Sequence, residues 1–149
     1  MLPAVPCERP GPMVGDMRPY FGGFGQVPMH SVTQKYMRGD CGYFALALHQ
    51  KMPGSQLWEL GGHHFVVEDP NGSFWDVRGQ LTVEQAWFGV RGQTMRPLSR
   101  KELITELDTG VFGDARFTPS REARARADLQ ALWCLSTAPQ AIQRRPGPR

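Results

Sequence analysis

The chain contains 149 residues, 40% of them hydrophobic, with 13 prolines, 17 glycines and a formal net charge of +3. This length suits one domain and is too short for two domains that each bury a sizeable core. The modest share of apolar residues and the many prolines and glycines indicate much irregular structure. No apolar run approaches a membrane span, and the first ten residues lack the apolar stretch of a secretory signal. We therefore expect a soluble, cytoplasmic protein without a membrane partner.

The cysteines bear on redox state and on metal binding. Cys7, Cys41 and Cys134 are odd in number and lack CxxC spacing, a pattern that argues against a disulfide framework and against a structural zinc site. We therefore expect a reducing compartment, no metal and no cofactor. Cys134 lies in a hydrophobic run and is expected to be a buried core thiol.

Positive charge is concentrated at the C-terminal end of the sequence. From residue 120 onward the sequence contains six arginines and only two acidic residues, Glu122 and Asp128. A solvated helix face followed by a disordered tail accounts for this pattern. Because aromatic residues are not interleaved with the arginines, the sequence does not predict a nucleic-acid partner.

The first predicted helix begins at Cys41, after an irregular arm that we expect over residues 1–30. Asp40 is a favourable N-cap residue, and apolar residues recur at every fourth position from Phe44 to Met52, as one buried helix face requires. Cys41 therefore falls on the first turn. There the free backbone N–H groups and the helix dipole favour an anion, and hence the reactive thiolate form of cysteine.

Two strands and a tight turn are predicted next. A strand over 56–60 is expected to pair with one that starts at His64, and the sequence Asp69-Pro70-Asn71-Gly72 fits a type I turn closed by a left-handed glycine. This turn pairs Asp69 with Ser73, so that His64 and Asp76 lie on one sheet face as diagonal neighbours, within about 8 Å at Cβ. The register therefore predicts a hydrogen bond between them.

Two nearby residues compete for these positions. His63 points to the opposite face in this register, but a turn of two or four residues would reverse the parity and favour His63. Glu68 shares the face of His64 and is the alternative to Asp76, which we prefer because Glu68 lies near the turn. A zinc site built from Cys41 and both histidines is disfavoured, because adjacent strand residues point to opposite faces.

The remaining sequence is predicted to be helical. Capping boxes that start at Thr82 and Ser99 place helices over 83–88 and 100–108. A third helix opens at Pro119, carries an apolar stripe at helical spacing, and is ended by Pro139. The predicted organisation is thus an arm over 1–30, a single domain over 31–138 and a disordered basic tail over 139–149.

Cys41, His64 and Asp76 supply a nucleophile, a base and an orienting carboxylate in that chain order. With the local sequences Asp40-Cys41-Gly42 and His64-Phe65-Val66-Val67, the chain resembles the papain-like cysteine peptidase superfamily, most closely its C39-type branch. Transglutaminase-like proteins and arylamine N-acetyltransferases share the same order. The resemblance covers residues 34–79 and implies a minimal papain-like α+β core: a helix carrying the cysteine packed on a small antiparallel sheet carrying the histidine and aspartate, with additional C-terminal helices.

The resemblance also implies a function. It predicts a cysteine-dependent hydrolase of amide or peptide bonds that forms a thioester acyl-enzyme on a protein or peptide substrate, with Gln34 as the candidate oxyanion donor beside the Cys41 backbone N–H. Two alternatives stay open: acyl transfer or deamidation by the same triad, and a protein-binding module on the same fold whose triad is idle. The sequence specifies neither the natural substrate nor the oligomeric state, and a secreted effector or phage-related role stays open.

Overall fold

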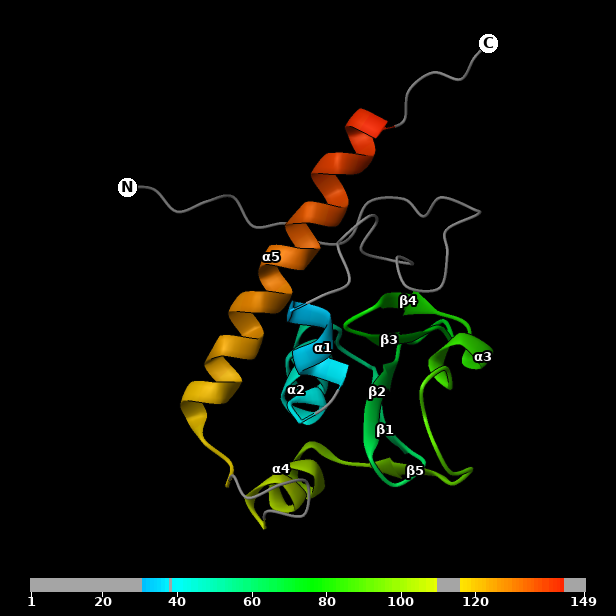
Figure 1. The fold of residues 1–149 in the computed structure, drawn as a ribbon, viewed down its shortest axis with the longest axis vertical. Helices are drawn as coiled ribbons and strands as arrows, with labels where there is room; N and C mark the ends of the chain where they lie inside the picture. Colours follow the sequence, from blue (N-terminus) through cyan, green and yellow to red (C-terminus); the bar gives the residue numbers. More distant parts are fainter. Residues whose placement is uncertain (1–30, 38, 110–115, 144–149) are drawn as a thin grey trace.

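The computed structural model describes residues 31–37, 39–109 and 116–143, and these residues form an α+β fold (Figure 1). The arm predicted over 1–30 and the last residues of the tail, 144–149, lie outside the described residues. The elements follow the chain as α1 (Ser31–Met37), α2 (Cys41–Lys51), β1 (Gln56–Leu60), β2 (His64–Glu68), β3 (Phe74–Asp76), β4 (Gly79–Leu81), α3 (Val83–Ala86), β5 (Met95–Leu98), α4 (Arg100–Asp108) and α5 (Pro119–Gln143).

The five strands form one antiparallel sheet in the order β4-β3-β2-β1-β5. β1 pairs with β2 so that Leu60 lies opposite His64 and Gln56 opposite Glu68, which confirms the predicted pairing of these two strands. β3 and β4 extend the sheet on one side, and β5 pairs with β1 on the other. The predicted fold class, helices combined with a small antiparallel sheet and further C-terminal helices, is confirmed.

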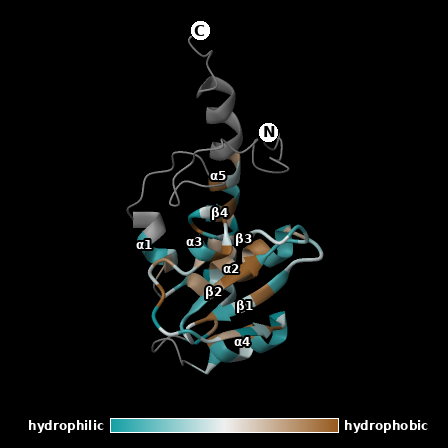
Figure 2. Ribbon diagram, turned by 90° about the vertical axis from the view of Figure 1, so that its right-hand side faces the viewer, coloured by the Kyte–Doolittle hydropathy of each residue, from teal (hydrophilic) through white to brown (hydrophobic). Residues whose placement is uncertain are grey.

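The helix α2 lies between the sheet and α5 (Figure 1). Every residue from Cys41 to Leu48 is buried, so the prediction of a single buried face on this helix is wrong: neighbours enclose it on several sides. Hydrophobic residues are concentrated in α2 and in the strands beside it (Figure 2), as expected for a helix that belongs in the interior. Cys41 therefore begins the helix around which the main core is built.

The last helix, α5, is longer than predicted. It begins at Pro119 as expected but continues through Pro139 to Gln143, so the predicted helix end and the start of a disordered tail at Pro139 are wrong. Proline removes one backbone donor and disfavours the helical conformation of the residue before it, but neither effect forbids a helix. The predicted apolar stripe of α5 is confirmed, because four residues at helical spacing are buried: Ala125, Leu129, Leu132 and Trp133.

Cys134 follows this stripe. It is half-buried, accepts a hydrogen bond from Gln130 Nε2 at 3.5 Å and is disulfide-bonded, whereas Cys41 is a free, buried cysteine. The expectation that Cys134 is a buried core thiol is therefore wrong. We predicted a reducing compartment on the assumption that the cysteines form no disulfide, and the disulfide of Cys134 removes that assumption.

The helix starts near the sheet follow the predicted capping chemistry. The side chains of Thr82 and Ser99 accept hydrogen bonds from the backbone N–H three residues on, at 3.1 and 3.0 Å, and both capping boxes are complete. α4 has the predicted bounds, whereas α3 stops at Ala86, two residues short of the predicted end. No helix among the described residues is both long and apolar enough to cross a membrane.

Candidate active site

The hairpin between β2 and β3 has the predicted register. Asp69 N–H donates to the Ser73 carbonyl at 2.8 Å, and Gly72, at φ +90°, donates to the Asp69 carbonyl at 2.9 Å. These bonds close a three-residue loop of the type that ends in a left-handed glycine. Because Val67 pairs with Trp75 in this register, Asp76 lies on the same sheet face as His64.

The predicted contact between His64 and Asp76 is present. The imidazole Nε2 lies 2.9 Å from Asp76 Oδ2, and the two side chains are only 2% and 3% exposed. Because a carboxylate only accepts hydrogen bonds, Nε2 carries a proton. The other ring nitrogen, Nδ1, is buried and has no hydrogen-bond partner among the residues that the structure describes, so it is the nitrogen available to a nearby thiol.

Cys41 is that thiol. As the first residue of α2 it lies where the helix N-terminus presents free backbone N–H groups. Its Sγ donates to the backbone carbonyl of His63 at 3.6 Å, which holds the sulfur at the start of β2. The residue that accepts from this thiol directly precedes His64, and Cys41 contributes to the raised pKa of the His64 imidazole. The structure therefore places the Cys41 thiol near the start of β2, whose first residue, His64, contacts Asp76.

The electrostatics of the site favour a charged imidazole. Burial lowers the pKa of His64, but the hydrogen bond to Asp76 and the electrostatic effects of Asp76 and of the nearby Cys41 raise it to about 9. For Asp76, burial raises the pKa, but Arg78 and His64 outweigh burial and hold it well below its usual value. At neutral pH the pair is therefore an imidazolium beside a carboxylate.

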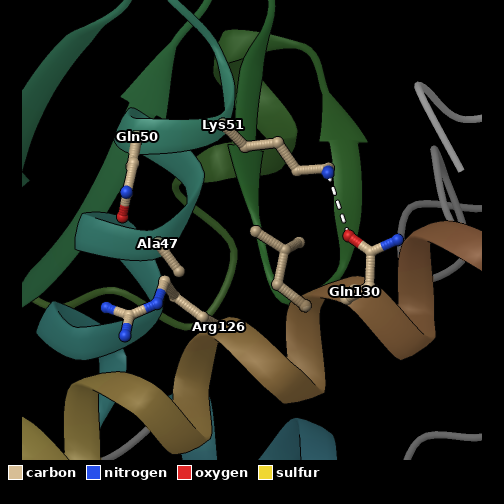
Figure 3. A pocket seen from close by; sticks show the side chains of 6 residues that line it. Ala47, Gln50, Lys51, Arg126 and Gln130 are labelled. Atoms are coloured by element: carbon tan, nitrogen blue, oxygen red, sulfur yellow. Dashed lines mark hydrogen bonds between the residues drawn. The ribbon is translucent and has the colours of Figure 1, made fainter. Parts of the chain in front are cut away.

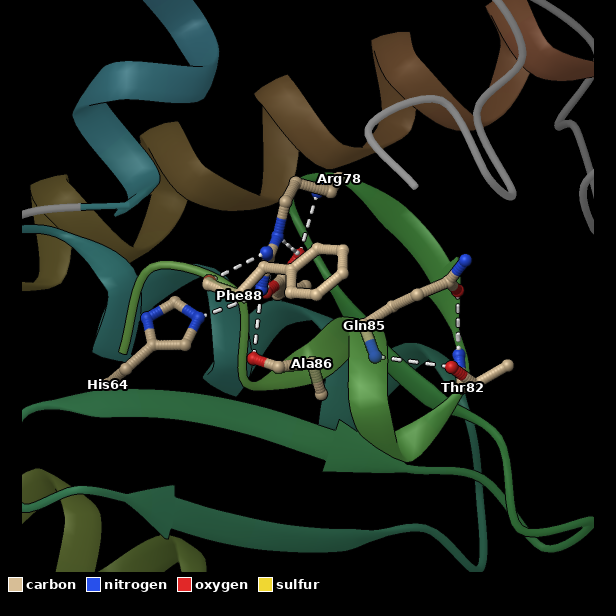
Figure 4. Close-up of polar contacts among 7 residues, drawn as sticks. His64, Arg78, Thr82, Gln85, Ala86 and Phe88 are labelled. Carbon is tan, nitrogen blue, oxygen red and sulfur yellow. Dashed lines mark hydrogen bonds and ion pairs between the residues drawn. The ribbon is translucent and has the colours of Figure 1, made fainter. Parts of the chain in front are cut away.

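Sequence reasoning missed Arg78 as a member of the site. Its side chain is almost fully buried, and its Nε and Nη2 donate to both oxygens of Asp76, at 3.0 Å to Oδ1 and 2.5 Å to Oδ2. The remaining donors reach the carbonyls of Ala86 and Phe88 at 3.1 and 2.9 Å (Figure 4). The signal was in the predicted register, which places Arg78 directly opposite His64 on the same face.

The alternative histidine, His63, has a different environment. It lies in the turn before β2, and its Nε2 accepts a hydrogen bond from the backbone N–H of Arg91 at 3.0 Å. Its side chain is exposed. His63 therefore contributes its backbone carbonyl to the Cys41 thiol, while its imidazole fastens the loop around Arg91.

The alternative carboxylate, Glu68, is also engaged elsewhere. Its Oε1 accepts a hydrogen bond from Trp58 Nε1 at 2.9 Å, and its side chain is only half-buried. It shares the sheet face of His64 as predicted, but Asp76 is the carboxylate that contacts the imidazole.

Gln34, the predicted oxyanion donor, lies on α1. Its side chain is exposed and makes no hydrogen bond to any residue in the described part of the chain. Its role in the site stays a prediction. Across the same described residues, no group of three or more His, Cys, Asp or Glu side chains is placed to hold a metal ion.

Asp40, the residue before Cys41, is the N-cap of α2 as predicted, and its carbonyl accepts from the Phe44 N–H at 3.2 Å. Its side chain, however, makes no cap hydrogen bond. Instead its carboxylate forms an ion pair with Arg121 of α5 and lies 3.8 Å from Lys35 of α1. Asp40 therefore ties the start of α2 to two neighbouring helices.

No protein family, no curated protein and no solved structure matches the chain. A function for this protein is therefore inferred from the chemistry of the residues described above.

An open pocket lies at the other end of α2, away from this site. Lys51 and Arg126 line it together with Gln130, whose Oε1 accepts a hydrogen bond from Lys51 Nζ at 3.0 Å (Figure 3). Cys41 is ten residues from Lys51 on the same helix, about 15 Å at the rise of an α-helix. This pocket is therefore separate from the candidate active site.

The turn before β2 gives a stability prediction. Gly61 has φ +65°, and a Cβ there would lie 2.0 Å from the Arg91 carbonyl oxygen, whereas Gly62 has φ +78° with open space around it. We expect Gly61→Ala to lower the free energy of unfolding by roughly 3 to 5 kcal/mol, since strain and overlap add, and Gly62→Ala to lower it by roughly 1 to 2 kcal/mol, from strain alone. Urea denaturation measures both. Equal losses would show that the close approach of the Arg91 backbone does not matter.

The raised pKa of His64 predicts a pH dependence of stability. Because the pKa rises from 6.5 in the unfolded chain to about 9 in the fold, the stabilisation is fully present below pH 6.5 and is lost as the pH rises through 9. We expect the free energy of unfolding of the wild type, relative to His64→Gln, to fall by on the order of 3 kcal/mol across this window. Denaturation curves from about pH 6 to 10 test this, and a constant difference between the two proteins contradicts it.

Proposed function

We propose that this protein is a cysteine-dependent hydrolase of amide or peptide bonds, of the papain-like type that its sequence resembles. The observation that carries the proposal is the buried imidazole of His64, which bonds through Nε2 to Asp76, while the free thiol of Cys41 at a helix start bonds to the carbonyl of the preceding residue, His63. A nucleophile, a base and an orienting carboxylate are the groups that covalent acyl chemistry requires.

In the first step the sulfur of Cys41, having given its proton to His64 Nδ1, attacks the carbonyl carbon of the substrate. The negative charge that develops on the carbonyl oxygen is stabilised by the backbone N–H of Cys41 at the helix N-terminus, with Gln34 as the proposed second donor. The imidazolium then protonates the leaving nitrogen as the C–N bond breaks. The products of this half are a free amine and a thioester on Cys41.

In the second step a water molecule attacks the thioester. His64 removes a proton from the water, the C–S bond breaks, and the carboxylic acid product leaves with the thiolate regenerated. Asp76 keeps the ring oriented through both steps because it holds Nε2, which leaves Nδ1 as the nitrogen that exchanges the proton. The raised pKa of His64 favours the protonated ring that the leaving nitrogen needs in the first step.

Alkylation with iodoacetamide at mildly acidic pH tests the proposal. We expect Cys41 to react at least about tenfold faster than glutathione, because an imidazolium stabilises its thiolate where an ordinary thiol is protonated. His64→Ala should abolish this advantage. His63→Ala is the matched control: it removes the adjacent, exposed imidazole but keeps the backbone carbonyl that contacts Sγ, so the fast reaction should persist.

The outcomes separate the open alternatives. A Cys41 that reacts no faster than glutathione, with equal rates in both histidine variants, overturns the proposal and favours a binding module with an idle triad. If Cys41 is activated, a labelled amine supplied with a peptide library distinguishes hydrolysis from acyl transfer. Peptides cleaved without incorporation of the amine support hydrolysis, whereas incorporation supports a transferase.

A further inference from the structure

The side chain of Arg78 is the feature of this site that the proposed mechanism leaves unused. It is a cation with almost no exposure to solvent, and within the described part of the chain Asp76 is the one carboxylate that it contacts; its other acceptors are the neutral carbonyls of Ala86 and Phe88. A buried cation of this kind is costly unless the surrounding charge balances it. The charge of Arg78 therefore influences which protonation states of the neighbouring groups are favoured.

Four ionisable groups lie in the site: the guanidinium of Arg78 contacts the carboxylate of Asp76, which contacts the imidazole of His64, and the thiol of Cys41 bonds to the carbonyl of the residue before His64. When the proton lies on the imidazole and the sulfur is a thiolate, their charges alternate and sum to zero. When the thiol keeps its proton beside the imidazolium, the four side chains together carry one unbalanced positive charge. Without Arg78 this order is reversed, and the thiol form becomes the neutral one.

We propose that Arg78 is a positioning residue of the proposed active site, whose buried charge, acting through Asp76 and His64, favours the thiolate form of Cys41. This inference deepens the proposed function and rests on it. The fork of Arg78 bonds also holds the carboxylate, since Nε contacts both Asp76 oxygens at 3.0 and 3.1 Å and the backbone N–H of Arg78 donates to Oδ1 at 2.8 Å. Charge and orientation thus come from one side chain.

The other charged groups around the start of α2 are already paired. Asp40 is bound by Arg121 from α5 and lies near Lys35 from α1. The exposed His63 accepts from the Arg91 backbone. Further along, Glu122 of α5 pairs with Arg100 at 2.5 Å and lies 3.5 Å from Arg126. Among the described residues, Arg78 is therefore the cation in direct contact with the carboxylate that orients His64.

The pH profile of Cys41 alkylation by iodoacetamide tests the proposal. We expect Arg78→Met to move the acidic midpoint of the profile upward by about one pH unit, so that the rate below the midpoint falls roughly tenfold, as loss of one charge several ångströms away predicts. Arg78→Lys keeps the charge and should restore most of the shift. Arg91→Met, which removes an exposed arginine of the neighbouring loop, is the control and should leave the midpoint unchanged.

The outcomes keep this inference distinct from the proposed function. If wild-type Cys41 is not activated, both fail. If it is activated but Arg78→Met leaves the midpoint in place, or Arg78→Lys shifts it as far as Arg78→Met does, only the role of the Arg78 charge is overturned. Should Arg78→Met not fold, Arg78→Gln takes its place, because the amide keeps donors for the Asp76 carboxylate but carries no charge. Arg78→Gln should move the midpoint upward by about one unit, and an unchanged midpoint contradicts the proposal.

Discussion

Cys41→Ser is expected to lower the rate of amide hydrolysis by roughly a thousandfold or more, because a hydroxyl does not ionise under conditions in which a thiolate forms and the acyl-enzyme depends on that sulfur. Serine is nearly isosteric with cysteine. Although this position is only 4% exposed, the serine hydroxyl can donate to the His63 carbonyl as the thiol does, so the fold should persist. The measurement is the cleavage of a pooled peptide library, followed by mass spectrometry, with thermal unfolding recorded in parallel.

The control for this experiment is His63→Ala, which alters a neighbouring residue of the site without removing a group of the proposed triad. It should retain most of the cleavage activity. Residual cleavage by Cys41→Ser above about a tenth of the wild-type rate would mean that the reaction does not pass through the sulfur.

Asp76→Ala is expected to be the most destabilising change in the site. It removes the carboxylate that balances Arg78 and leaves a cation with 1% side-chain exposure without its counter-ion. Loss of one partner of a buried ion pair costs about 3 to 5 kcal/mol, measurable as a lower free energy of unfolding in urea. Cleavage activity should fall as well, since His64 loses the acceptor for Nε2.

Glu68→Ala is the matched control for Asp76→Ala. Glu68 is a carboxylate on the same sheet face, but it accepts from Trp58 and is only half-buried, so we expect a loss of about 1 kcal/mol. If the two variants lose equal stability, the burial of the Asp76 and Arg78 pair has no special energetic weight.

The features that could be predicted from the sequence are those set by local chemistry. The turn at Asp69 to Gly72 determined the register of the hairpin, and the register placed His64 and Asp76 on one face, as the 2.9 Å contact confirms. The hydroxyls of Thr82 and Ser99 likewise fixed the starts of α3 and α4. In each case the local structure is determined by residues that are close together in the sequence.

The features that could not be predicted depend on partners distant in the chain. Asp40 has the side chain of an N-cap, but the pairing with Arg121, 81 residues away, outcompetes the cap. Strand β5 contains Pro97, a residue that argues against a strand when the sequence is considered alone. This proline is tolerated because β5 lies at the edge of the sheet. The role of Arg78 depends on the carbonyls of the segment after β4, whose position no local pattern specifies.

The enclosure of α2 has a consequence for how a substrate reaches the nucleophile. Because residues Cys41 to Leu48 are packed between the sheet and α5, displacing this helix would dismantle the main core. Its amide hydrogens from Phe44 to Leu48 should exchange with deuterium only when the whole domain unfolds. In the proposed reaction, a peptide would therefore reach the sulfur through rearrangement of the segments that border it, while the helix that carries the sulfur stays fixed.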